Sequence, residues 1–263
     1  MKPHTAHALT VMTREGYERI ADQFDRTRRK HWNDFTVFDS SVKEGDSVLD
    51  IGCGNGRLFS YLAHKSIAYV GIDASRSLIA RAETAYHAHP LEPRFIVGDI
   101  LSLDHIQELR GKKFHAIFMV ASFHHIPRRR QALAALKRAR QFLLPNGLLC
   151  MENWNLWRLD KGPKTAWSGL SRRLSFALLP WEKEYGISHF DLGINDIITE
   201  WKSEGVKGHL YYHAYTVRAL RSLLHEAGYT IKRSYYIRDG VRARWWNGKN
   251  IMTIAQPLNS RHR

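Results

Sequence analysis

Cysteine is scarce in this chain of 263 residues, which contains only Cys53 and Cys150. With no paired spacing between them, the two cysteines indicate neither a disulfide framework nor a zinc site, and we expect no metal centre. Long apolar runs are also missing: the first residues lack the core of a signal peptide, and no stretch approaches the ~20 apolar residues of a membrane span. These absences argue against a disulfide-rich secreted domain and predict a cytoplasmic protein with no membrane partner.

Acidic residues are in deficit. The 25 Asp and Glu residues face 40 Lys and Arg residues, which gives a formal net charge of +15 and a pI of about 10.0. A balance this basic fits a polyanionic partner, although basic faces that serve only solubility would give the same total. The length allows one domain of about 200 to 250 residues with a sizeable core.

Three glycines mark the most informative stretch. Residues 48–51 have the apolar pattern of a buried strand, and Gly52, Gly54 and Gly56 follow at every second position before a helical pattern begins. Glycine at such a turn lets a ligand approach bare backbone. A tight turn without a ligand would also use glycine, so residues at fixed distances beyond the loop decide its meaning.

Strand and helix patterns alternate beyond this loop, which predicts an α/β fold with a parallel sheet covered by helices on both faces. In such a sheet a ligand binds beyond the carboxyl ends of the strands. A closing helix from Thr216 to Gly228 precedes two last strands at 229–237 and 250–255. The earlier strands are expected at 67–72, 94–97, 114–120 and 148–152, and the helices at 57–64, 75–86, 103–109 and 128–143.

The two ends and one internal segment do not follow this alternation. Residues 1–12 show no pattern and are expected to be mobile, and a helical pattern begins only at Thr13. Tryptophans scattered among basic residues indicate an inserted lid or substrate segment. We divide the chain into an N-terminal helical extension with a basic loop (1–35), a main domain (36–256) that contains the lid (154–208), and a basic tail (257–263).

Two acids extend the glycine loop toward a nucleotide site. Asp73 ends the second expected strand, 23 positions after Asp50, close to the ~20-residue offset at which an acid meets ribose hydroxyls in nucleotide-binding βαβ units. Asp99 ends the third strand, where it would meet an adenine edge. Either acid alone would serve equally well as a helix N-cap. Capping alone does not explain a glycine loop and two acids at the ends of three successive strands, so the pattern favours a nucleotide site.

The segment Asp50-Ile-Gly52-Cys-Gly54-Asn-Gly56 resembles the S-adenosylmethionine-binding motif of class I methyltransferases, Asp-x-Gly-x-Gly-x-Gly. The third glycine comes one position earlier than in dinucleotide-binding folds, and Leu144-Pro-Asn-Gly147 is similar to a turn of the same family. The resemblance implies a Rossmann-like, mainly parallel seven-stranded sheet and S-adenosyl-L-methionine as cofactor. It implies cofactor contacts from Asp50, Gly52, Cys53, Gly54, Asn55, Gly56, Asp73, Ala74, Asp99, Ile100 and Val120.

Further segments resemble one subfamily, the tRNA wobble-uridine methyltransferases that esterify 5-carboxymethyluridine. They are residues 17–32, 121–126, 196–202 and 210–215, and Leu210 stands where the subfamily has arginine. The resemblance implies that the chain binds the anticodon arm of tRNA. Eukaryotic members use a small zinc-bearing activator subunit, and the sequence does not indicate whether this chain needs one.

A carboxylate acceptor is already ionised at pH 7, so methyl transfer to it requires positioning rather than a general base. Arg28 is the predicted carboxylate clamp, and His124 and His125 complete the predicted catalytic set. Each histidine has a structural alternative, a hydrogen bond to the lid backbone, and at least one of the two tyrosines proposed to stack on the base is expected to be structural. The predicted substrate-binding residues are Tyr17, Thr27, Arg28, Trp32, Asn153, Tyr211, Tyr212 and His213.

Four basic segments, Arg128–Arg130, Lys137–Arg140, Arg172–Arg173 and Arg242–Lys249, are candidates for contacts with RNA phosphates. Two other functions stay open at this point. One is a methyltransferase of a small metabolite or of another RNA position, with the tryptophans serving an apolar substrate. The other is a non-catalytic RNA-binding protein that retains the fold.

Overall fold

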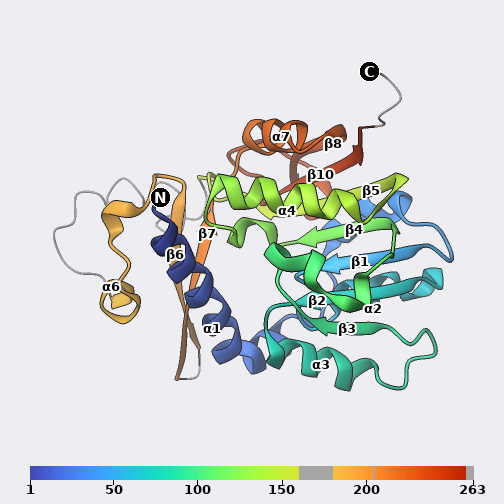
Figure 1. Ribbon diagram of the computed structural model, residues 1–263, viewed down its shortest axis with the longest axis horizontal. Helices are drawn as coiled ribbons and strands as arrows, with labels where there is room; N and C mark the ends of the chain where they lie inside the picture. Colours follow the sequence, from blue (N-terminus) through green and yellow to red (C-terminus); the bar gives the residue numbers. More distant parts are fainter. Residues whose placement is uncertain (160–179, 204, 259–263) are drawn as a thin grey trace.

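The computed structural model describes residues 1–159, 180–203 and 205–258. Its central sheet has the strand order β3-β2-β1-β4-β5-β10-β8-β9 (Figure 1), with parallel pairing from β3 to β5 and antiparallel pairing of β10 with both β5 and β8. The order reverses between β1 and β4, the position at which α/β sheets bind ligands. The strands are β1 (Ser47–Ile51), β2 (Ala68–Asp73), β3 (Arg94–Val97), β4 (Phe114–Val120), β5 (Leu143–Trp154), β8 (Tyr229–Arg238), β9 (Val241–Arg242) and β10 (Asn250–Pro257).

The α/β prediction is confirmed, and each expected strand is present within a few residues of its expected bounds. The sheet has eight strands rather than seven, because the two-residue β9 pairs with the end of β8. The expected turn at Leu144–Gly147 is absorbed into β5 as an irregularity, and the register between β4 and β5 shifts between Phe114 and Ala116. The first strands therefore deliver the glycine loop and both acids to one edge, as the sequence indicated.

Helices cover both faces of the sheet (Figure 1). On one face α4 (Arg129–Gln141) and α7 (Val217–Glu226) bury their apolar sides with the strands in a common core. The Thr216 side chain accepts the Ala219 N–H at 3.2 Å, so Thr216 is the expected N-cap of α7. The other face is covered by η1 (Asn33–Ser41), α2 (Arg57–Leu62), η2 (Ala63–Lys65) and α3 (Arg76–Tyr86), while the helix expected at 103–109 forms the short 3-10 helices η3 (Ile100–His105) and η4 (Gln107–Leu109).

The N-terminal helix α1 (Pro3–Thr27) begins ten residues earlier than expected. The expectation that residues 1–12 are mobile is wrong for a physical reason: Ala6, Leu9 and Met12 are fully buried and continue the apolar face of the helix. Leu9 and Met12 pack with Ile187, Leu192 and Tyr211, which are distant in sequence, and a local pattern does not reveal such contacts.

Part of the segment expected to be a lid forms a β-hairpin. β6 (Asp196–Ser203) pairs antiparallel with β7 (Val206–His213), apart from the main sheet, and α1 packs along β7 (Figure 1). The expected lid boundary at residue 208 falls inside β7, while residues 160–179, including Arg172–Arg173, lie outside the described residues. The remaining short elements are η5 (Phe123–His125), α6 (Pro180–Tyr185) and η6 (His189–Asp191). Among the described helices, none is long and apolar enough to cross a membrane.

Gly16 of α1 offers a stability test, because a Cβ at this position would lie 2.5 Å from the His209 carbonyl oxygen and 2.9 Å from Leu210 Cδ2. In an ordinary helix, Gly→Ala raises stability by about 1 kcal/mol. Overpacking against the β7 backbone costs typically about 1–3 kcal/mol, so Gly16→Ala is expected to lower the free energy of unfolding. Denaturant titration measures the difference, and an increase in stability would contradict this packing.

Candidate active site

The glycine loop joins β1 to α2 and is tied to the end of β2. The Gly54 N–H donates to Asp73 Oδ2 and the Ser75 N–H donates to Asp73 Oδ1, both at 2.9 Å. Burial raises the pKa of Asp73, and the two donors oppose this rise. Gly52 has φ +83°, and a Cβ there would lie 2.2 Å from Ser122 Cβ, so the loop requires glycine at this point. The Asp73 carboxylate is thus fixed in orientation beside bare backbone.

The other two acids differ in their surroundings. The Tyr69 hydroxyl donates to Asp50 Oδ2 at 2.7 Å, whereas the buried Oδ1 has no partner among the described residues. Burial raises the pKa of Asp50 to about 7, against the opposing effect of the Tyr69 hydrogen bond. The Asp99 side chain accepts the Leu101 N–H at 2.8 Å and caps η3. The capping alternative therefore holds for Asp99, which nevertheless faces the cavity described next.

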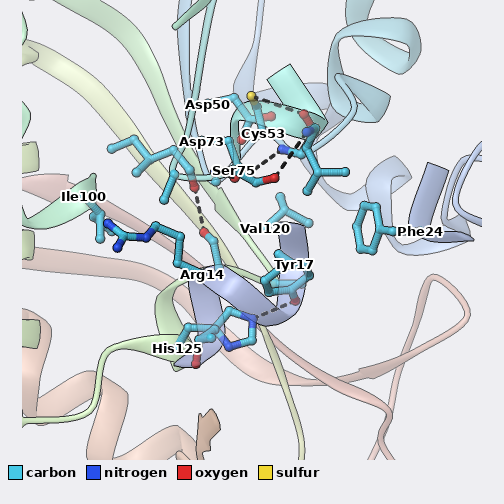
Figure 2. A pocket seen from close by; sticks show the side chains of 18 of the residues that line it. Arg14, Tyr17, Phe24, Asp50, Cys53, Asp73, Ser75, Ile100, Val120 and His125 are labelled. Atoms are coloured by element: carbon cyan, nitrogen blue, oxygen red, sulfur yellow. Dashed lines mark hydrogen bonds between the residues drawn. The ribbon is translucent and has the colours of Figure 1, made fainter. Parts of the chain in front are cut away.

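A cavity lies between these strand ends and α1, and Figure 2 shows some of the side chains that line it. Ten of the eleven predicted cofactor contacts line this cavity. Gly56 does not; it precedes α2, and a Cβ there would meet Tyr86 and Phe95. From the predicted catalytic and substrate-binding sets the cavity lining includes Tyr17, Arg28, Trp32 and His125. The structure thus brings these residues together, and their roles stay predictions.

Six residues of the predicted catalytic and substrate-binding sets do not line the cavity. Tyr211 and Tyr212 are 0% and 2% exposed: the Tyr211 hydroxyl donates to Asp196 at 2.5 Å, and the Tyr212 ring stacks on Trp154 at 5.0 Å between centroids. Stacking on a base requires an open ring face, and both rings are internal in this structure, where we expected at least one of them to be structural. The others are His124, Asn153, Thr27 and His213.

Each of these four residues is buried or forms a hydrogen bond within the protein. His124 and Asn153 are fully buried, and His124 Nδ1 accepts the Trp154 N–H at 3.3 Å, which matches the structural alternative for this histidine. The Thr27 hydroxyl donates to the Gln23 carbonyl at 2.7 Å. His213 Nδ1 lies 3.0 Å from Asp196 Oδ1. A substrate role for any of them would require side-chain rearrangement.

His125 has a fixed tautomer. Its Nδ1 lies 2.6 Å from the Tyr211 carbonyl oxygen, which only accepts, so Nδ1 carries the proton. Nε2 is then an acceptor, and the Tyr17 hydroxyl donates to it at 2.9 Å (Figure 2). Burial lowers the pKa of His125 to about 4. His125 is therefore neutral near pH 7, a weak base, and a support that orients Tyr17 at the cavity wall.

Arg57 is a cavity residue that the sequence interpretation missed. It follows the glycine loop as the first residue of α2, and its guanidinium carbon lies 4.0 Å from the Trp32 ring centroid. The second cationic wall residue, Arg28, lies over the Trp201 ring at 5.2 Å. Burial and then the charge of Arg28 lower the pKa of Arg57 to about 10. Among the described residues neither guanidinium has an ion pair. Arg28 Nη1 donates to the Thr27 carbonyl at 3.4 Å, and Arg14 is a third arginine in the cavity lining.

Glu152 lies near Arg57 at the end of β5 and is fully buried. The Asn250 amide donates to Glu152 Oε1 at 2.5 Å and to Asp34 Oδ2 at 2.8 Å. Burial, followed by the charge of Asp34, raises the pKa of Glu152 to about 8, against the opposing effect of Arg57. Glu152 is therefore mainly protonated at pH 7 and compensates little of the charge of Arg57, which is also close enough to Asp50 for that carboxylate to raise its pKa.

Residues 48–147 match the family model described as a methyltransferase domain. A protein named tRNA (carboxymethyluridine(34)-5-O)-methyltransferase of Arabidopsis thaliana is 26% identical over 157 residues, which cover 60% of this chain and 36% of that protein. A protein of the same name from Schizosaccharomyces pombe is 24% identical over 231 residues, 88% of this chain and 92% of that protein. The chain thus spans about a third of the first relative and most of the second.

Solved structures share the fold. An S-adenosylmethionine-dependent methyltransferase from Clostridium acetobutylicum has a TM-score of 0.63 at 16% identity, covering 92% of this chain and 99% of its own. A chain in the complex between the Haloferax volcanii Trm112 methyltransferase activator and the putative methyltransferase has a TM-score of 0.61 at 16% identity, covering 95% and 100%. At these identities the likeness shows the Rossmann-like methyltransferase fold.

The residues of the cavity fit S-adenosylmethionine. A Cβ at Gly54 would lie 3.3 Å from Phe24, so the loop leaves a narrow space that bare backbone keeps open. Asp73 is oriented to accept from ribose hydroxyls, and the unpartnered Asp50 Oδ1 faces the same cavity. When bound, this cofactor supplies an electrophilic methyl group, and the chain supplies the orientation of donor and acceptor.

Asp73→Asn tests the cofactor site. Asparagine keeps the shape but loses the charge and one of the two acceptor oxygens, so affinity for S-adenosylmethionine is expected to fall roughly 10- to 100-fold, as for a lost hydrogen bond to a charged group. Calorimetric titration measures the affinity. Asp22→Asn on the exposed face of α1 (81% side-chain exposure) is the matched control, and equal affinities for both variants would contradict the assignment.

Glu152 gives a pH-dependent stability. Its folded pKa of about 8 exceeds the ordinary 4.5, so its stabilising contribution is full below about pH 4.5 and is lost as pH rises through about 8. Glu152→Gln removes this dependence. The variant is expected to gain stability relative to the native chain between pH 5 and 9, by on the order of a few kcal/mol. Denaturant titrations at several pH values check this, and a constant difference would contradict a buried neutral acid.

Proposed function

We propose that this chain is an S-adenosylmethionine-dependent methyltransferase that esterifies the carboxylate of 5-carboxymethyluridine at the wobble position of tRNA. The observation that carries the proposal is the pair Arg28 and Arg57, two cations without carboxylate partners among the described residues on the wall of one cavity. Asp50, Asp73 and Asp99 line the same cavity, but among the described residues none of them pairs with Arg28 or Arg57, so these two guanidinium groups are available to an anionic acceptor. The names of the relatives from Arabidopsis thaliana and Schizosaccharomyces pombe support the same substrate.

The protonation state of His125 is compatible with a carboxylate acceptor. Its pKa is about 4 and its Nε2 already accepts from Tyr17, so it is not the base that methylation of a hydroxyl or amine would use. Asp50 has the pKa of such a base, about 7, and its unpartnered Oδ1 lies in the same cavity, so the pH dependence of the rate decides between the two classes of acceptor. A carboxylate needs no proton removed. Arg28 and Arg57 would each hold one oxygen edge and align the acceptor with the donor methyl group, and neutral His125 would keep the Tyr17 hydroxyl in place.

The basic surface supports a tRNA partner. The formal net charge is +15, and phosphate contacts by Lys and Arg dominate affinity for nucleic acids. We extend the proposal to an activator subunit only as far as the shared fold with the chain from the Haloferax volcanii activator complex suggests it. Co-purification with a small zinc-bearing protein tests that extension.

The reaction itself is tested with labelled S-adenosylmethionine and tRNA that carries carboxymethyluridine. A base-labile methyl ester on that nucleoside is the expected product, at a rate that is flat above about pH 6 because the acceptor is already ionised. Unmodified tRNA is the control. A product stable to base, or a rate that rises steeply between pH 7 and 9, would indicate a hydroxyl or amine acceptor instead.

Arg57→Gln separates acceptor binding from cofactor binding. Loss of one charge-assisted hydrogen bond is expected to lower kcat/KM for the modified tRNA roughly 10- to 100-fold, while the affinity for S-adenosylmethionine stays within about twofold. Arg94→Gln is a matched control, because Arg94 is exposed and begins β3, at the end of the strand opposite the cavity. A loss confined to cofactor affinity would assign Arg57 to the cofactor carboxylate.

A further inference from the structure

Two neighbouring tryptophans lie on the surface in the loop between β9 and β10. We call residues 243–249, Ala-Arg-Trp-Trp-Asn-Gly-Lys, the tryptophan loop. Trp245 is 44% exposed and Trp246 is 40% exposed, and their rings meet edge to face with centroids 5.8 Å apart. A single exposed aromatic side chain is ordinary, but two adjacent indoles form an apolar surface that costs solvation free energy unless a ligand uses it.

The backbone of the tryptophan loop is held in place without the rings. Asn155, which is 1% exposed, donates from its side-chain amide to the carbonyls of Trp245 at 2.6 Å and Gly248 at 2.9 Å. The Gly248 N–H donates to the Arg244 carbonyl at 2.8 Å, and the Lys249 N–H donates to the Ile237 carbonyl at 2.8 Å. These hydrogen bonds fix the backbone of the tryptophan loop. None of them involves an indole ring, so they do not explain why both indoles face solvent.

Cations accompany the rings. The guanidinium carbon of Arg244 lies 5.3 Å from the Trp246 ring centroid, and that of Arg242 lies 5.4 Å from the Tyr235 ring centroid. Neither arginine has an ion pair within the described ranges. Lys249, in contrast, pairs with Asp239 at 2.6 Å. Aromatic faces next to unpaired arginines are the combination with which proteins hold single-stranded nucleic acid.

The tryptophan loop lies at the same edge of the sheet as the cavity. Asn250, the first residue of β10, pairs with Trp154, whose side chain lines the cavity. On the other side the Gly240 N–H donates to Asp34 Oδ1 at 2.5 Å, and Asp34 follows the cavity residue Trp32 by two positions. A strand of RNA whose target nucleotide enters the cavity would therefore have its flanking nucleotides within reach of the loop.

We infer that the tryptophan loop is a stacking platform for unpaired bases next to the target nucleotide, with Trp245 and Trp246 as the stacking surfaces and Arg242 and Arg244 as phosphate contacts. This inference rests on the proposed tRNA substrate. It adds that the tryptophan loop is the surface by which the protein distinguishes an RNA loop from an RNA duplex. Bases in a duplex have no free faces, whereas loop bases stack on indoles. The charges favour RNA over an apolar protein partner, because a hydrophobic interface would leave two arginines unpaired.

The test uses the full chain and two labelled RNAs of equal phosphate number: a stem-loop with carboxymethyluridine in its loop, and a duplex. Trp245→Ala and Trp246→Ala are each expected to weaken binding of the stem-loop on the order of tenfold or more and to leave duplex binding unchanged. Trp246→Phe keeps an aromatic face and should retain most of the affinity. Arg244→Gln should weaken both RNAs and lower the salt slope by about one.

Phe190→Ala is the matched control, because Phe190 is an exposed aromatic residue (69%) outside the tryptophan loop, and it should change nothing. Affinity for S-adenosylmethionine and the unfolding midpoint should stay at native values in all variants. Equal stem-loop affinity of the native chain and both alanine variants would overturn the inference, and so would a loss of the same size for the duplex or the absence of stem-loop binding by the native chain.

The failure of this inference and of the proposed function are distinguishable. Alanine variants that esterify modified tRNA with an unchanged KM would refute the platform and leave the function standing. A native chain that forms no ester, yet binds the stem-loop through Trp245 and Trp246, would refute the carboxylate acceptor and leave the platform standing.

Discussion

The docking of α1 across the carboxyl edge of the sheet is the contact on which the cavity depends. Both Glu18 carboxylate oxygens accept N–H groups at the start of α3, from Arg76 at 2.5 Å and Ser77 at 3.1 Å. Burial alone would raise the pKa of Glu18, but these hydrogen bonds outweigh it and lower the pKa. A carboxylate at a helix N-terminus is also favoured by the helix dipole. The strands alone present an open crevice, and α1 closes it.

The second anchor of α1 lies in the glycine loop. The Asn55 amide donates to Asp25 Oδ1 at 2.9 Å, so the residue between two loop glycines holds the end of the helix. Tyr17 and Arg28 reach the cavity only because the helix is fixed at Glu18 and Asp25. The glycine loop, which is proposed to bind the cofactor, thereby also positions Arg28, which is proposed to hold the acceptor. The geometry of the cofactor site and that of the acceptor site are therefore linked.

Charge is distributed unevenly inside this enclosure. Burial moves the pKa of Glu152 to about 8 and that of His125 to about 4, so both are mainly neutral at pH 7. Arg28 and Arg57 keep their charge. A low-dielectric cavity strengthens the field of such cations, and aromatic faces at Trp32 and Trp201 hold them without neutralising them. Asp50, Asp73 and Asp99 line the same cavity, so the positive charge is local to the two guanidinium groups and favours an anionic group only where a substrate reaches them.

The sequence was most informative where backbone chemistry is local. The glycines and Asp73 are recognisable because the turn and the end of β2 require those residue types at a fixed spacing. Arg57 was missed because a basic first residue of a helix is ordinary in sequence, and only the packing of η1 places Trp32 over it. Tyr211 and Tyr212 are both internal, where the sequence indicated this for at least one of them, because β7 is covered on both faces by α1 and by the residues after β4 and β5.

In the proposed function, recognition of the substrate is divided between the cavity and the tryptophan loop, which use different interactions. Inside the cavity, desolvated guanidinium groups distinguish a carboxylate from a neutral group, but they contact only the end of one nucleotide and supply limited affinity. Outside it, aromatic and cationic groups on a rigid loop add binding from the rest of the RNA, and contacts made by remote parts of a substrate help to fix the reacting group in line. Under the proposed function, a free carboxymethylated nucleoside would satisfy the cavity and lose these outer contacts, so we infer that the surface beyond the cavity favours an RNA over a metabolite.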